Sequence, residues 1–137
     1  MEETVIVIML KDEKTGFLDK ELGSYTLSED SELIFNIYAE GGEGETIVLR
    51  LTCNKEFQDW EYDAVYDYYD MDAVKALVDD MEEEDGHYDP VWIMRFPFIE
   101  DQDAMEEKLS QIIEAHKKEL LSVYDVIKDK EDDYRAE

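Results

Sequence analysis

A row of regularly spaced side chains near the C-terminus sets the architecture that this chain can adopt. The row is mainly apolar and consists of Met105, Leu109, Ile112, His116, Leu120, Val123 and Ile127. Its mean spacing is close to the 3.6 residues per turn of a straight α-helix, whereas a left-handed coiled coil needs 3.5. We therefore predict one helix over residues 101–128, roughly 40 Å long, that packs on a sheet rather than pairing with a second helix. Asp103 and Glu106 match a capping box at its start.

Most of the remaining chain shows strand patterns. Four segments are expected to be strands because they alternate or are rich in β-branched residues: 4–10, 17–27, 46–53 and 91–98. Residues 4–10 are apolar on both faces, which is typical of a strand that is covered on both sides. Gly23 indicates a bulge in its strand, and Pro97 indicates an edge position or the end of a strand.

Three other segments are harder to interpret. Residues 28–39 fit both a helix and a strand, and both readings stay open. Residues 57–69 also fit both, but their aromatic side chains favour a strand, and a helix would stack acidic residues one turn apart. Residues 72–81 share one apolar face at helical spacing, so we expect a short helix that ends at the acidic run beginning at Glu82. Residues after about 128 are charged, and we expect them to fray.

These patterns together predict a single α+β domain over residues 1–137. It would contain an antiparallel sheet of about four to six strands, with the long C-terminal helix and the short helix packed on it. The length of 137 residues agrees with one domain.

The charge of the chain limits its partners. It has 39 acidic and 13 basic residues, a net charge of −26, yet its 44% hydrophobic content is too high for a disordered acidic tail. A surface this negative argues against binding nucleic acid directly or docking on an anionic membrane. Residues 56–107 alone hold 19 acidic and 2 basic residues, a net charge of −17.

The sequence shows no secretion signal and no apolar run near the roughly 20 residues of a membrane span. With the single cysteine Cys53, this indicates a cytoplasmic protein.

Nucleophilic catalysis has little support in the sequence. Cys53 lies on the apolar face of its strand, so we expect a buried, inert thiol. His116 belongs to the apolar row of the helix and is expected to be a packed side chain, while His87 lies in a loop without a motif. The glycine-rich segment 41–45 lacks the lysine of a phosphate-binding loop. We therefore expect a protein that is not an enzyme and needs no cofactor.

Carboxylates suggest a weak metal interaction at most. Placing Gly86 at the glycine position of a calcium-binding EF-hand puts Met81 and Trp92 at its ligand positions, so that motif fails. Non-specific, low-affinity uptake of Ca²⁺ or Mg²⁺ is expected at the run Asp79, Asp80, Glu82, Glu83, Glu84 and Asp85.

A mixed acidic and aromatic segment is the strongest candidate for a binding site. Its members are Asp59, Trp60, Glu61, Asp63, Asp67, Tyr69 and Asp70. Aromatic side chains supply contact area and acidic ones select a basic partner, so we expect this segment to bind a basic protein. Two alternatives stay open, namely a DNA mimic that inhibits a nucleic-acid-binding protein and a divalent-metal-dependent enzyme that uses clustered carboxylates. The identity of the partner and the oligomeric state stay open.

The stretch Asp59-Trp60-Glu61-Tyr62-Asp63-Ala64-Val65-Tyr66-Asp67-Tyr68-Tyr69-Asp70, with the later His116-Lys117-Lys118-Glu119-Leu120, resembles a family of small acidic uncharacterised proteins from clostridia-type Gram-positive bacteria. The resemblance covers most of the chain. It implies no activity, cofactor or catalytic residue.

Overall fold

The fold is an open sheet with helices packed on one side. The computed structural model describes residues 4–12, 14–27, 31–41, 45–53, 57–84, 86–87 and 89–135. The strands in these residues are β1 (Thr4–Lys11), β2 (Leu18–Leu27), β3 (Ile34–Glu40), β4 (Thr46–Leu51), β5 (Asp80–Glu84) and β6 (Val91–Pro97). They form one six-stranded sheet in the order β2-β1-β3-β4-β6-β5. Neighbours are antiparallel except β1 and β3, which are parallel, so the predicted α+β class is confirmed.

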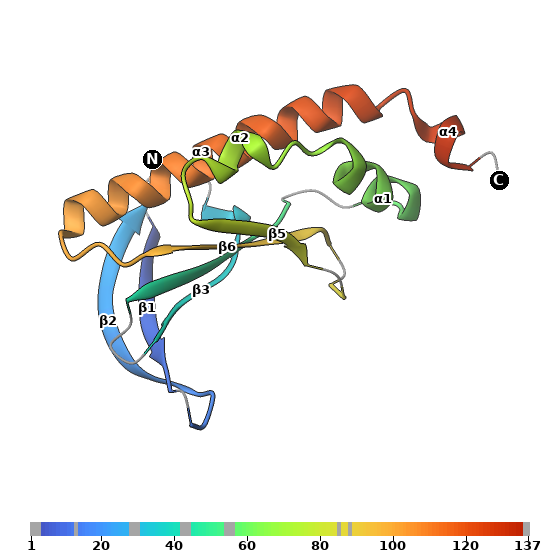
Figure 1. Ribbon diagram of the computed structural model, residues 1–137. Coiled ribbons are helices and arrows are strands. Elements are labelled where there is room, and N and C mark those ends of the chain that lie inside the picture. Colours follow the sequence, from blue (N-terminus) through green and yellow to red (C-terminus); the bar gives the residue numbers. More distant parts are fainter. Residues whose placement is uncertain are drawn as a thin grey trace.

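The helices lie together on one face of this sheet, and α3 runs across it (Figure 1). They are the 3₁₀ turn Ser31–Leu33 and the α-helices α1 (Asp59–Tyr68), α2 (Asp72–Lys75), α3 (Gln102–Ile127) and α4 (Glu131–Arg135). Every member of the predicted row on α3 is buried. This confirms that the long helix packs on the sheet. No helix among the described residues is long and apolar enough to cross a membrane.

The start of α3 differs from the predicted capping box. Asp101 is the N-cap, and its carboxylate accepts a hydrogen bond of 2.9 Å from the backbone N–H of Ala104. Asp103 therefore lies inside the helix. Glu106 reaches the sheet instead, where it accepts a hydrogen bond of 2.6 Å from the backbone N–H of Thr26 at the edge strand β2. The cap and the contact with the sheet are therefore made by two different acidic side chains.

At strand β1, the described residues cover only one face of the sheet. Its Ile8 is fully buried under the helices, but Val5 is 62% and Val7 46% exposed on the opposite face. The prediction that both faces of this strand are covered was therefore wrong. The two other details held: the register shifts beside Gly23, and Pro97 is the last residue of β6.

The ambiguous segments were decided by their neighbours in space. Residues 34–40 form strand β3 and residues 59–68 form helix α1, so the strand predicted for the latter was wrong. Within 72–81 only the first turn is helical, and residues 80–84 form the edge strand β5, which the sequence did not indicate. Residues after 128 were predicted to fray, but they include helix α4. The Tyr134 ring of α4 packs near the Trp60 ring, with centroids 6.1 Å apart.

Candidate functional site

Helix α1 displays a row of carboxylates toward solvent. The N-cap of α1 is Gln58, whose backbone N–H donates a hydrogen bond of 3.0 Å to the Glu61 carboxylate. Ala64 and Val65 are buried on the inner side of α1. Repulsion between acidic residues one turn apart costs only a few tenths of a kcal/mol per pair. Burying the apolar side chains is worth more, about 1.5–3 kcal/mol for a valine, so the helix forms despite the acidic row.

A hollow of about 450 Å³ lies beside the start of α1. The residues that line it are Phe57, Gln58, Asp59, Tyr62, Asp63 and His87. The Tyr62 ring meets the Tyr66 ring edge-on, with centroids 5.2 Å apart. Among the described residues, no basic side chain forms an ion pair with Asp59 or Asp63. Two carboxylates beside aromatic rings form a surface suited to a cationic side chain.

His87 connects this hollow to the opposite face of the sheet. Its Nε2 lies 2.6 Å from Oε1 of Glu84, and its ring packs edge-on against Phe35 with centroids 4.9 Å apart. The same oxygen of Glu84 accepts a hydrogen bond of 2.8 Å from Nε of Arg50. That bond is the main reason why the pKa of Glu84 is lowered from its ordinary value. One wall of the hollow is therefore held by side chains from β4, from β5 and from His87 after β5.

The predicted binding residues differ in how far they are exposed to solvent. Asp59, Asp63, Asp67 and Asp70 are exposed, and Trp60 and Glu61 are half-buried. Asp67 accepts a hydrogen bond of 2.6 Å from the Tyr134 hydroxyl, which ties α4 to α1. Tyr69 is buried and belongs to the core, so placing it on a binding surface was wrong.

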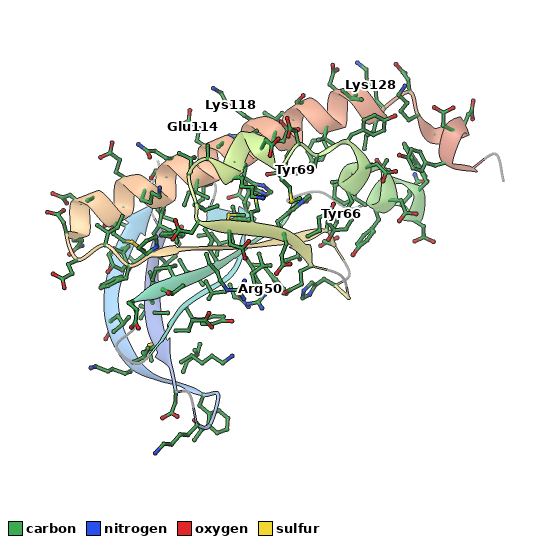
Figure 2. All side chains as sticks on the ribbon, viewed as in Figure 1. Arg50, Tyr66, Tyr69, Glu114, Lys118 and Lys128 are labelled. Carbon is green, nitrogen blue, oxygen red and sulfur yellow. The ribbon has the colours of Figure 1, made fainter. Side chains whose placement is uncertain are left out.

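The core position of Tyr69 explains the buried histidine. The hydroxyl of Tyr69 (Figure 2) lies 2.7 Å from Nδ1 of His116. Nε2 of His116 lies 2.8 Å from the carbonyl oxygen of Thr52. Burial lowers the pKa of His116 to about 4, so the imidazole is neutral near pH 7. Burial also raises the pKa of Tyr69, which keeps its proton available for Nδ1. Both ring nitrogens are thus engaged in holding the core together.

Cys53 is also buried, 6% exposed, as the sequence predicted. Because the Tyr69 hydroxyl and the Thr52 carbonyl occupy both nitrogens of His116, this histidine has no nitrogen left to act as a base for the thiol. The arrangement is that of a packed core.

The acidic run expected to take up metal ions serves as counter-ions on strand β5. Asp80 and Glu82 lie 3.6 Å and 3.9 Å from Nη1 of Arg95, and Glu84 binds Arg50. Glu83 is on the other face of the strand, Asp79 precedes the strand, and Asp85 lies outside the described residues. Within the described part of the chain, no three potential ligands are placed to hold a metal ion.

Sequence reasoning missed Phe57, Tyr62 and His87 as partners in one hollow. Phe57 lies just before α1 and Tyr62 lies in its first turn, so both are beside the start of α1 only because residues 59–68 form a helix and not the predicted strand. His87 lies in the turn between β5 and β6, a strand pair that the sequence did not predict. The acidic and aromatic composition of the segment was the available signal, and it indicated the region but not these members.

Added salt is expected to stabilise the protein. Residues 56–107 carry a net charge of −17, and Asp59, Asp63 and Asp67 of α1 are exposed, with no ion pair to a basic side chain among the described residues. Salt at 0.1 M screens such repulsion beyond about 10 Å. The midpoint of thermal unfolding should therefore rise across a NaCl series. A flat or falling midpoint would show that the acidic groups are already balanced by bound ions.

A comparison with family models shows which family the chain belongs to. A family described as "Family of unknown function (DUF6762)" matches residues 1–135, and the chain belongs to it. No curated protein and no solved structure matches the chain. The resemblance to clostridia-type proteins stays a prediction.

Proposed function

We propose that this member of the DUF6762 family is a non-enzymatic protein that binds a basic segment of a partner protein in the hollow beside α1. The observation that carries the proposal is the lining of that hollow, in which Asp59 and Asp63 stand beside the rings of Phe57 and Tyr62. A Lys or Arg side chain can place its charge between the carboxylates and its aliphatic stem against the rings. We propose that this interaction takes place in the cytoplasm.

The charge around the hollow supports a role in selecting the partner. The acidic row continues from Asp63 to Asp67 and Asp70, all of them exposed. Charges of one sign along a surface raise the rate at which an oppositely charged partner arrives, and they repel partners of the same sign. Binding that depends on this row should weaken as salt is added.

Asp59→Asn combined with Asp63→Asn is expected to weaken binding of a basic peptide about tenfold. Each substitution removes a charge from the hollow but keeps the size of the side chain, and tenfold corresponds to about 1.4 kcal/mol. The measurement is fluorescence anisotropy of a labelled peptide of Lys, Arg and Gly in about 0.1 M NaCl.

The matched control for this prediction is Glu107→Gln combined with Glu114→Gln. Both residues are exposed on α3, and the pair changes the net charge by the same amount. This control should bind the peptide almost as well as the unmodified protein. Equal losses in the two double variants would mean that the peptide responds only to net charge, and they would overturn the proposal.

A DNA mimic is the second candidate, and the acidic row is what supports it. Asp59, Asp63 and Asp67 follow one another at four-residue intervals, which is about 6 Å along a helix. A mimic would depend on the whole row, whereas binding in the hollow depends on its first two members. Asp67→Asn therefore separates the two candidates. A loss of peptide affinity as large as the loss caused by Asp59→Asn favours the mimic.

A further inference from the structure

The face of the sheet opposite the helices carries exposed apolar side chains on an interior strand. β1 lies between β2 and β3, and its Val5 and Val7 point away from the core with exposures of 62% and 46%. Strands that are apolar on both faces are typical of sheets covered on both sides. In the described residues the helices cover only one side (Figure 1).

Short polar side chains on β2 lie beside these valines. In the register of β1 and β2, Thr26 is opposite Val5 and Ser24 is opposite Val7. Phe35, on the neighbouring strand β3, is 47% exposed. Five of the eight large exposed apolar side chains in the described residues lie on or beside β1, β2 and β3: Val5, Val7, Phe17, Leu18 and Phe35. A second sheet can approach such a surface to about 10 Å.

The described basic side chains on the rest of this open face contact carboxylates or an aromatic ring within the chain. Arg50 (Figure 2) binds Glu84. Arg95 lies within 4.0 Å of carboxylate oxygens of Glu40, Asp80 and Glu82. Lys11 lies over the Tyr38 ring, with its Nζ 5.5 Å from the centroid. This face is therefore much closer to neutral than the chain as a whole, whose net charge is −26.

We propose that the open face binds a second copy of the same chain, face to face, with Val5 and Val7 of each copy in the centre of the interface. A basic partner would be attracted to the acidic surface around α1 and has no reason to select this face. Another copy carries the same large negative charge, so it can approach only where its charges are already paired. A two-fold arrangement brings the same apolar patch from both copies together.

This proposal does not rest on the proposed function, because Val5 and Val7 do not line the hollow beside α1. The two also respond to salt in opposite ways. Dimer formation should become stronger as NaCl is added, since salt screens the repulsion between two copies and leaves the apolar contact intact. Binding of a basic peptide should become weaker. Failure of one proposal therefore leaves the other open to its own test.

The test is the mass of the full-length chain by sedimentation equilibrium, over a concentration series and a NaCl series. The expected result is twice the 16.1 kDa of one chain. Val7→Asp should give a monomer, because it places a charge in the interface. Leu121→Asp is the matched control: Leu121 is 57% exposed, but it lies on α3, so this variant should remain a dimer.

A second variant guards against loss of folding. Val7→Thr keeps the branched side chain that strands favour, and it should weaken the dimer about tenfold, because the change occurs in both copies. Circular dichroism checks that each variant is folded. A chain that is monomeric throughout both series would overturn the proposal and leave the face to a different protein. A folded Val7→Asp dimer, or a folded Leu121→Asp monomer, would overturn it as well.

Discussion

Ile112→Asp is expected to unfold the protein or to leave it severely destabilised. Ile112 is fully buried in the middle of the α3 row, among the side chains that join the helix to the sheet. The substitution removes apolar contacts and places a carboxylate in the apolar core. Changes of this kind lower the free energy of unfolding by about 4 kcal/mol or more. Small domains are stable by only about 5–15 kcal/mol. Thermal melts followed by circular dichroism, together with sizing, measure the effect.

Glu114→Lys is the control on the same helix. Glu114 is exposed on the side of α3 that faces away from the sheet (Figure 2). This change also alters a charge, but it should shift stability only slightly, because the side chain is exposed and makes no core contact. It also reduces the negative excess at the surface. If both variants were tolerated, α3 would not be packed in the core. A folded, stable Ile112→Asp monomer would contradict the role that the structure assigns to this row.

Acidification from pH 6.5 to pH 4 is expected to remove about 3 kcal/mol of stability through His116 alone. Burial lowers its pKa to about 4 in the folded chain, from 6.5 as the ordinary value. In this pH window the unfolded chain binds a proton at His116 that the folded chain does not, so the free energy of unfolding falls as the pH falls. Each pKa unit corresponds to about 1.4 kcal/mol.

The His116→Gln variant isolates this contribution. Glutamine is neutral at every pH and still offers an acceptor to Tyr69 and a donor to Thr52. The many carboxylates titrate in both proteins, so the difference between the two unfolding free energies reports on His116. This difference should shrink steadily from pH 6.5 to pH 4. His87→Gln is the comparison, since it removes the other histidine and leaves the His116 contribution in place. A difference between unmodified protein and His116→Gln that stays constant with pH would contradict a neutral, buried imidazole.

The candidate site was visible in the sequence only in part. The acidic and aromatic character of 59–70 indicated the region, and its four aspartates are exposed as a binding surface requires. The sequence could not show that Tyr69 points into the core, because its partners are far along the chain. Its ring stacks on that of Trp92 with centroids 4.4 Å apart, and its hydroxyl lies 2.7 Å from Nδ1 of His116. Nor could the sequence show that His87 joins Phe57 and Tyr62, since they come from separate segments.

The sequence by itself determined the elements whose pattern is long and regular. The α3 row spans about six turns and has one consistent face, and the alternation of β4 buries Ile47, Leu49 and Leu51 on one side. Periodicity alone defines such elements, because the regular spacing sets which side chains lie together on one face.

Only the tertiary structure decided the short and charged elements. Helix α1 forms because Ala64 and Val65 pack inward, which outweighs the repulsion within its acidic row. Strand β5 is a poor strand by composition, yet it pairs with β6 because its carboxylates meet Arg50 and Arg95 across the sheet. In both, the deciding energies come from residues that are distant in sequence, and the local pattern does not contain them.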